Sequence, residues 1–230
     1  MIPLSDENPT FLRPVVTIAI IAANIAVFLY QLSLLVADPR LEEALIYQFG
    51  VVPAAMTHGV FLGTGEYYRT LTSMFLHGGW LHIIGNMLYL WIFGNNVEDS
   101  MGHLRFVIFY LLTGVIAACA HIAIQPASTI PTIGASGAVS GILGAYLVLH
   151  PHARIKTLVP LFVFFTVAYI PAWLFLVVWI GWQVLSQSLV PASPTAGGVA
   201  YGAHIGGFIA GALLISLFRK YRRGRDFSYL

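Results

Sequence analysis

The sequence predicts an all-α membrane protein built as a bundle of six spanning helices. Of its 230 residues, 58% are apolar and only 9% are charged, whereas a soluble domain carries about 25% charged residues. Long charge-free runs separate short charged stretches, and these runs supply the roughly 20 residues that a helix needs to cross a bilayer. Each span must be helical, because lipid offers no hydrogen-bond partner to an open backbone.

The charge-free runs and the turn signals within them predict where the spans lie. Turn signals divide the runs 106–153 and 157–218 into two spans each: Pro126 and Pro131 within 125–131, and prolines with Gly197 and Gly198 within 191–198. Pro171 falls within the fifth span and is expected to kink it. In chain order, the expected spans cover approximately 14–37, 77–93, 104–124, 134–150, 158–182 and 199–218.

Basic residues predict the orientation, because six spans place both chain ends on one side. Of the 11 Lys and Arg residues, only Arg40 and Arg69 fall on the other side. The side with the excess is the cytosolic one. We therefore expect a cytosolic segment over 1–13, a six-span domain over 14–218 and a basic cytosolic tail over 219–230. The first apolar run is too long for a cleaved signal, and the lack of a transit peptide favours a bacterial inner membrane.

Four polar side chains within the spans are candidates for a functional site, since such groups are costly in a membrane. His82 and Asn86 lie one to two turns below the outer start of the second span. Ser136 lies in the first turn of the fourth span, and His204 lies a little over one turn into the sixth. Three helices thus carry polar groups at a similar depth, in the outer half of the membrane.

These residue types are typical of nucleophilic catalysis. A serine hydroxyl becomes reactive when a base takes its proton, and His204 is the candidate base for Ser136. All nine acidic residues map outside the predicted spans, so we expect a Ser–His pair rather than a triad. His82 and Asn86 are four residues apart and share a helix face. Together with the backbone N–H of Ser136, they are candidate donors to an oxyanion.

Alternative interpretations exist for the same residues. A serine in a span usually bonds to its own helix, and the small residues of 134–141, like Gly207 and Gly211, are typical of close helix packing. Close packing would also bring His204 toward Ser136. The sequence has no His-Glu-x-x-His motif and no Asp within a span, which argues against zinc and aspartyl intramembrane proteases. Cys119 is expected to be a small core residue.

The chain resembles the rhomboid intramembrane proteases over about residues 14–218. Three motifs carry the resemblance: Gly-x-Ser-x, His-x-x-x-Asn and Ala-His followed by small residues. A loop arginine before the second span and an acidic residue after it add to the match. The matching residues are Gly134 to Gly137, His82 to Asn86, Ala203 to Gly207 with Gly211, Arg69 after Tyr68, and Glu98.

The resemblance implies hydrolysis of peptide bonds in or near transmembrane segments of other membrane proteins. It implies a Ser136–His204 dyad, an oxyanion hole from His82, Asn86 and the Ser136 backbone, and no cofactor or metal. The expected partners are transmembrane substrates and the bilayer, with no nucleic acid. The fifth span and its following loop would gate substrate access. One position departs from the family: many members carry a tyrosine four residues after the serine, where this chain has Ser140.

Two other functions compete with this interpretation. A rhomboid-like protein that binds membrane clients without cutting them usually lacks the serine or the histidine, and this chain has both. A transporter or channel would require charged residues or broken helices at the membrane midplane, and the predicted spans contain no charged side chain.

Overall fold

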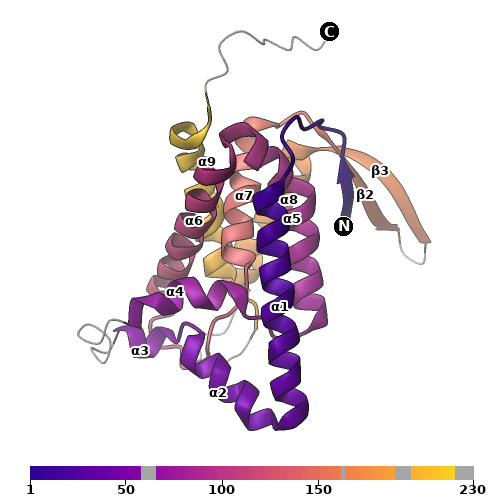
Figure 1. Ribbon diagram of the computed structural model, residues 1–230. Helices are drawn as coiled ribbons and strands as arrows, with labels where there is room; N and C mark the ends of the chain where they lie inside the picture. The colour runs from indigo at the N-terminus through magenta and orange to yellow at the C-terminus, as the bar shows by residue number, and fades with distance from the viewer. Residues whose placement is uncertain (58–65, 162–163, 190–197, 221–230) are drawn as a thin grey trace.

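Six helices of at least 14 residues stand side by side in the computed structural model, which describes residues 1–57, 66–161, 164–189 and 198–220 (Figure 1). They are α1 (Val15–Ala37), α5 (Trp80–Met101), α6 (His103–Ile124), α7 (Ser136–Leu149), α8 (Ala172–Leu189) and α9 (Tyr201–Phe218). Between α1 and α5 lie α2 (Pro39–Phe49), α3 (Pro53–Thr57), α4 (Arg69–Thr72) and two 3-10 turns, Glu66–Tyr68 and Ser73–Phe75. The chain is therefore mostly helical, but it is not all-α as predicted, since three strands form a small sheet.

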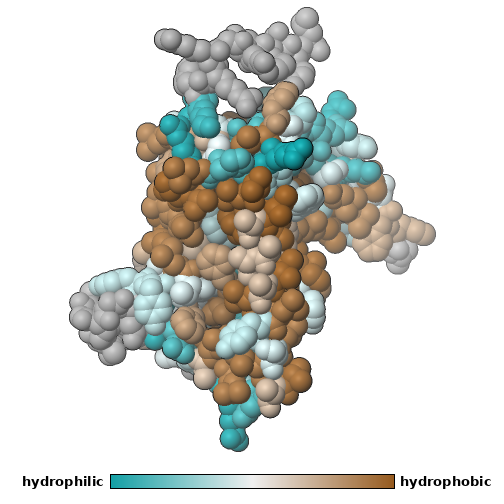
Figure 2. Space-filling view, viewed as in Figure 1, coloured by the Kyte–Doolittle hydropathy of each residue, from teal (hydrophilic) through white to brown (hydrophobic). Residues whose placement is uncertain are grey.

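The surface of the bundle is typical of a membrane protein. Helices α1, α6, α8 and α9 each have at least 18 residues and are apolar enough to cross a bilayer. Helix α5 has 22 residues but is more polar, and α7 is apolar with only 14. Figure 2 shows an apolar lateral surface with polar groups gathered toward the two ends. The chain is a multi-pass membrane protein.

Helix α7 lies at the centre of the bundle and packs against α5, α6 and α9. Its residues from Gly137 to Tyr146 are all buried. A Cβ added at Gly207 would meet the carbonyl oxygen of Gly137, and one added at Gly211 would meet that of Gly141. The prediction of close packing through small residues is therefore confirmed, and it brings the α9 backbone directly against α7.

Both described chain ends lie at one end of the bundle, which we call the terminal end. The Tyr146 hydroxyl donates to Asp6 Oδ2 at 2.7 Å, which holds the first residues beside α7. The backbone N–H of Lys220 donates to the carbonyl oxygen of Ser100 at 2.9 Å, which holds the end of the described chain beside α5. Helices α2 and α4 lie toward the opposite end (Figure 1).

Helix α5 is longer than predicted at the terminal end. Glu98 lies in its last turns, not in a loop, and its side chain is fully buried. The carboxylate accepts hydrogen bonds from the backbone N–H groups of Val16 at 3.0 Å and Thr17 at 2.8 Å. It caps α1, whose first N–H groups have no partner in their own helix and whose dipole favours a negative charge. The expected end of this helix near Phe93 is therefore wrong.

The predicted helix over 158–182 is wrong in its first half. Strands β2 (Arg154–Leu161) and β3 (Phe164–Pro171) form an antiparallel hairpin, and β1 (Ile2–Asp6) pairs with the free side of β2. Helix α8 begins directly after Pro171, so this proline ends a strand and kinks no helix. Charge-free composition does not separate a strand from a buried helix, and the β-branched and aromatic residues crowded here favour strands.

The remaining sequence predictions concern Cys119 and two segments of the chain. Cys119 is exposed on α6, so its assignment to the core is wrong. Residues 190–197, which hold the predicted turn before the last span, and residues 221–230 of the predicted basic tail lie outside the described residues.

Candidate active site

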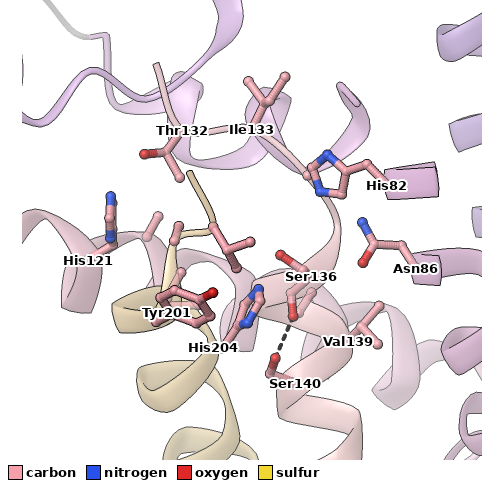
Figure 3. A pocket seen from close by; sticks show the side chains of 18 of the residues that line it. His82, Asn86, His121, Thr132, Ile133, Ser136, Val139, Ser140, Tyr201 and His204 are labelled. Atoms are coloured by element: carbon pink, nitrogen blue, oxygen red, sulfur yellow. Dashed lines mark hydrogen bonds between the residues drawn. The ribbon is translucent and has the colours of Figure 1, made fainter. Parts of the chain in front are cut away.

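A cavity of about 890 Å³ opens among α5, α6, α7, α8 and α9, on the side of the bundle away from the terminal end. All four candidate residues line it: His82, Asn86, Ser136 and His204 (Figure 3). No Asp, Glu, Lys or Arg side chain is among its described lining residues. The three helices predicted to carry polar groups at a similar depth therefore line one pocket without charged side chains.

The short length of α7 sets the depth of Ser136. Ser136 is the first residue of this 14-residue helix, which spans about 21 Å at 1.5 Å per residue, less than the thickness of a hydrocarbon core. The loop before α7 is held by an isolated bridge between Val51 and Thr132. The Ser136 backbone N–H belongs to the first turn, where such groups have no partner in their own helix.

Gly134 is required by the turn that leads into α7. Its φ of +120° favours glycine, and its backbone N–H donates to the carbonyl oxygen of Ser73 at 2.8 Å. A Cβ added here would collide with Nε2 of His82. The glycine of the Gly-x-Ser motif therefore lets the turn before α7 lie directly against His82 on α5.

His82 and Asn86 present donors from one face of α5. His82 Nδ1 accepts the backbone N–H of Gly78 at 3.3 Å, which assigns the proton of a neutral ring to Nε2, the nitrogen beside Gly134. Asn86 is buried, and its amide nitrogen has no hydrogen-bond partner among the described residues. An unpaired buried donor is costly, and this one faces the cavity close to Ser136 (Figure 3).

Two residues of α8 hold His204, and sequence reasoning missed both. His204 Nδ1 lies 2.8 Å from Oε1 of Gln183, which is itself buried. The amide nitrogen of Gln183 donates to the carbonyl oxygen of Trp179 at 3.4 Å, which is consistent with Oε1 facing the histidine. The Trp179 ring stacks on the imidazole with centroids 6.0 Å apart and an interplanar angle of 27°.

Ser136 and His204 line the same cavity without a direct hydrogen bond between their side chains. Figure 3 shows the two side chains lying next to each other, with Ser140 one turn below the serine. The Ser140 hydroxyl donates to the carbonyl oxygen of Ser136 at 2.6 Å, so it bonds within its own helix. Catalytic hydrogen bonds are often longer in a free enzyme than in its substrate complex.

His121 of α6 is a further histidine of the cavity wall. It is buried and lines the pocket, and its Nδ1 has no hydrogen-bond partner among the described residues. His77 is also buried, and its ring meets that of His82 edge to face at 5.0 Å. Within the described part of the chain, no three His, Cys, Asp or Glu side chains group as metal ligands.

Comparison with known proteins gives the family. The sequence model of the Rhomboid domain family matches residues 64–221, which is well over half of the chain. Rhomboid protease GluP of Bacillus subtilis is 41% identical over 86 residues, covering 37% of this chain and 16% of that protein. Rhomboid-like protein 11, chloroplastic, of Arabidopsis thaliana is 28% identical over 167 residues, covering 67% of this chain and 54% of its own length.

A yeast relative extends the similarity. Rhomboid protein 1, mitochondrial, of Saccharomyces cerevisiae is 31% identical over 147 residues, covering 61% of this chain and 39% of that protein. The chain thus spans less than two thirds of the length of each of these relatives. The domain match includes Ser136, His204, His82 and Asn86. The chain belongs to the rhomboid family.

Proposed function

We propose that this protein is an intramembrane serine endopeptidase that cuts other membrane proteins in or near their transmembrane segments. The observation that carries the proposal is the meeting of Ser136 and His204, from α7 and α9, in one uncharged cavity whose wall also presents the unpaired amide of Asn86. Several of the similar rhomboid proteins are named proteases.

The contact between His204 and Gln183 supports the role of His204 as base. Gln183 Oε1 has no proton to donate, so the nitrogen at 2.8 Å from it, Nδ1, is the one that carries the proton in a neutral ring. Nε2 then holds a free lone pair that can take the proton of Ser136. A neutral amide thus does the orienting that a carboxylate does in a triad.

Trp179 supplies the aromatic support that the family places elsewhere. Many rhomboids stack a tyrosine on the histidine from the position that Ser140 occupies here, and Ser140 bonds to its own helix instead. The Trp179 ring stacks on His204 from α8, one turn before Gln183. Both supports of the base therefore come from the same helix.

The reaction would proceed through an acyl-enzyme. The Ser136 Oγ forms a bond to the scissile carbonyl carbon while its proton passes to His204 Nε2. The negative oxygen of the tetrahedral intermediate accepts hydrogen bonds from the Asn86 amide, His82 Nε2–H and the Ser136 N–H. The C–N bond then breaks as His204 returns the proton to the leaving nitrogen. Water completes the hydrolysis in a second round of the same transfers.

We also propose the membrane arrangement expected from the sequence. Six segments would cross the bilayer, five of them as long helices and one as α7 with the loop before it, and the terminal end would face the cytosol. Arg105, Arg154, Lys156 and Lys220 lie at the terminal end, and Arg40 and Arg69 lie with α2 and α4 toward the other. This excess supports a cytosolic terminal end of a cell-membrane protein, with domain limits at 14 and 218.

The walls of the cavity suggest how a substrate helix reaches the serine. Helix α8 meets α5 through Phe175, whose ring lies 6.4 Å from Tyr89 and 6.2 Å from Phe93. These contacts lie in the first turn of α8, toward the terminal end, whereas Trp179 and Trp182 line the cavity further along. A helix approaching between α5 and α8 would meet apolar and aromatic side chains before Ser136, which suits a transmembrane segment.

Reconstitution with candidate substrates tests the proposal. The purified protein would be placed in proteoliposomes with a panel of single-span membrane proteins, and cleavage products would be identified by mass spectrometry. We expect cleavage within or beside a transmembrane segment, and none with Ser136→Ala. Stable binding of panel members without any cleavage by the wild-type protein would contradict the proposal and favour a client-binding rhomboid-like protein.

A further inference from the structure

The hairpin of β2 and β3 carries an exposed apolar surface that no part of the proposed mechanism uses. The strands pair from Arg154 opposite Pro171 at the base to Leu161 opposite Phe164 near the tip. The large apolar side chains beside the tip are strongly exposed: Leu161 is 52%, Phe164 74% and Phe165 69% exposed. A single layer of strands cannot bury such a surface against itself.

Charge and polarity change along the length of the hairpin. Its base holds Arg154 and Lys156, and β1 adds Asp6 opposite Ile155. From residue 157 to the start of α8 the sequence has no charged side chain. The charged residues at the base are therefore separated along the strands from the aromatic residues at the far end. Charged and aromatic groups are distributed in the same way across a membrane interface.

The position of the hairpin matches this polarity. In Figure 1 the two strands leave the terminal end and slope away from the bundle and back along its length, rather than out beyond it. In Figure 2 the apolar part of the hairpin lies at the level of the apolar lateral surface of the helices, below the polar groups of the terminal end. The lipid-facing surface of the bundle thus continues onto the hairpin.

We propose that the hairpin is an interfacial anchor that inserts into the bilayer leaflet at the terminal end. Leu161, Phe164 and Phe165 lie among acyl chains, and Arg154 and Lys156 lie among the lipid headgroups. Each strand has eight residues, about 26 Å at 3.3 Å per residue, and the two strands run antiparallel. The hairpin therefore enters and leaves on one side and does not cross a hydrocarbon core of about 30 Å.

The backbone of β3 limits how deep the hairpin lies. Among the described residues β3 pairs only with β2, so its outer edge presents unpaired N–H and C=O groups. Such groups are not tolerated in the middle of a bilayer but find water and headgroups at its interface. The other edge is protected at the base, where β1 pairs with β2 from Leu158 to Ile155. An oblique, shallow position satisfies both the apolar tip and the open edge.

Site-directed fluorescence in vesicles tests the anchor. In a Cys119→Ala background, which removes the only cysteine, single variants Phe165→Cys, Arg154→Cys and Leu213→Cys would be labelled with the fluorophore NBD. Leu213 is 71% exposed on α9 and serves as the lipid-facing reference. The proteins would be reconstituted in phosphatidylcholine–phosphatidylglycerol vesicles, with iodide on both faces or with nitroxide-labelled lipids as quenchers.

We expect the label at 165 to be quenched by nitroxide lipids nearly as strongly as the label at 213 and to be protected from iodide. The label at 154 should show the reverse pattern. Quenching at 165 by iodide, without quenching by nitroxide lipids, would overturn the proposal. So would protection from both quenchers together with cross-linking between copies, which would assign the apolar surface to a second copy of the chain.

A second variant separates anchoring from folding. Leu161→Ser with Phe164→Ser removes apolar surface from side chains that are already exposed, so the bundle should fold as before by circular dichroism and gel filtration. The label at 165 should then become several-fold more accessible to iodide. Unchanged accessibility in this folded variant would also overturn the anchor.

Discussion

Oε1 of Gln183 lies 2.8 Å from Nδ1 of His204, so a neutral side chain on α8 orients the imidazole on α9. The first prediction follows from this contact. In Gln183→Leu the buried Nδ1–H loses its acceptor, which costs about 1–3 kcal/mol. A cost of this size corresponds to a loss of about 5- to 150-fold in the rate of reaction at Ser136. The measurement is the rate of labelling by a fluorophosphonate in mild detergent.

Two further variants show whether the loss of labelling arises because His204 is no longer oriented. Gln183→Glu keeps an acceptor at the same place and should label well above Gln183→Leu. Ser188→Ala removes a polar group from the exposed face of the same helix, where the hydroxyl donates to the carbonyl oxygen of Leu185, and should label like wild type. Equal labelling of wild type and Gln183→Leu would remove Gln183 from the mechanism.

The second prediction concerns Gly134. Gly134→Ala imposes a strained backbone at φ +120° and drives a methyl group into the His82 ring, so labelling of Ser136 should fall by at least tenfold. Gly79→Ala is the matched control, because Gly79 also has a positive φ, of 151°, but its added Cβ meets nothing within 4 Å. That variant should lose some thermal stability and keep its labelling rate. A similar loss of labelling in both would point to backbone strain instead of the His82 contact.

The third prediction concerns the oxyanion. Asn86→Ala removes a donor whose nitrogen has no protein partner among the described residues, so the fold should persist while catalysis slows. Removing one oxyanion donor typically costs about 100- to 1,000-fold. Once a cleavable substrate is found, kcat would be compared with that of Asn95→Ala, near the other end of α5. An unchanged kcat in Asn86→Ala would exclude this amide from the oxyanion hole.

The fourth prediction concerns the contact between α7 and α9. Gly211→Ala places a methyl group against the Gly141 carbonyl, and the helices must separate to accept it. The melting temperature should fall by several degrees, as expected for an overpacking cost of about 1–3 kcal/mol. Gly181→Ala on α8 is the control, since its Cβ meets nothing within 4 Å and alanine favours a helix. Equal melting temperatures for the two variants would contradict the packing account.

The fifth prediction is a pH dependence at the terminal end. Burial raises the pKa of Asp6 above its ordinary value of 3.8, against the lowering effect of hydrogen bonds such as that from Tyr146. The folded protein therefore holds this proton more tightly than the unfolded chain. The free energy of unfolding should fall as pH rises from 3.8 through the raised pKa, and this loss is absent in Asp6→Asn. Melting curves should show the variant gaining stability relative to wild type as pH rises; a constant difference would contradict the raised pKa.

The sequence was sufficient to predict that four polar side chains lie near one another. A polar group in a span is costly, so His82, Asn86, Ser136 and His204 stood out by their location, and the helix count placed them at one depth. The small residues of α7 and α9 likewise predicted the close packing that the structure confirms. Each of these inferences rests on local composition, which a single sequence displays directly.

Gln183, one support of His204, was missed because the fifth span was placed too early. The absence of charge does not distinguish a membrane helix from an apolar hairpin, so the predicted helix began at 158 and ended at 182. Gln183 then fell just outside it and was not counted as an intramembrane polar group, although it lies within α8. Glu98 was misplaced for a related reason, because a charged residue was taken to end a helix that continues into a buried cap.

The central claim is that Ser136 is activated by His204, and it is tested most directly without a substrate. Purified wild type, Ser136→Ala and His204→Ala, each verified as folded and monodisperse, would be treated with a fluorescent fluorophosphonate, and the labelled residue would be mapped by mass spectrometry. The account predicts labelling of wild type at Ser136 and none of either variant. Labelling of His204→Ala at the wild-type rate, or no labelling of wild type, would contradict it.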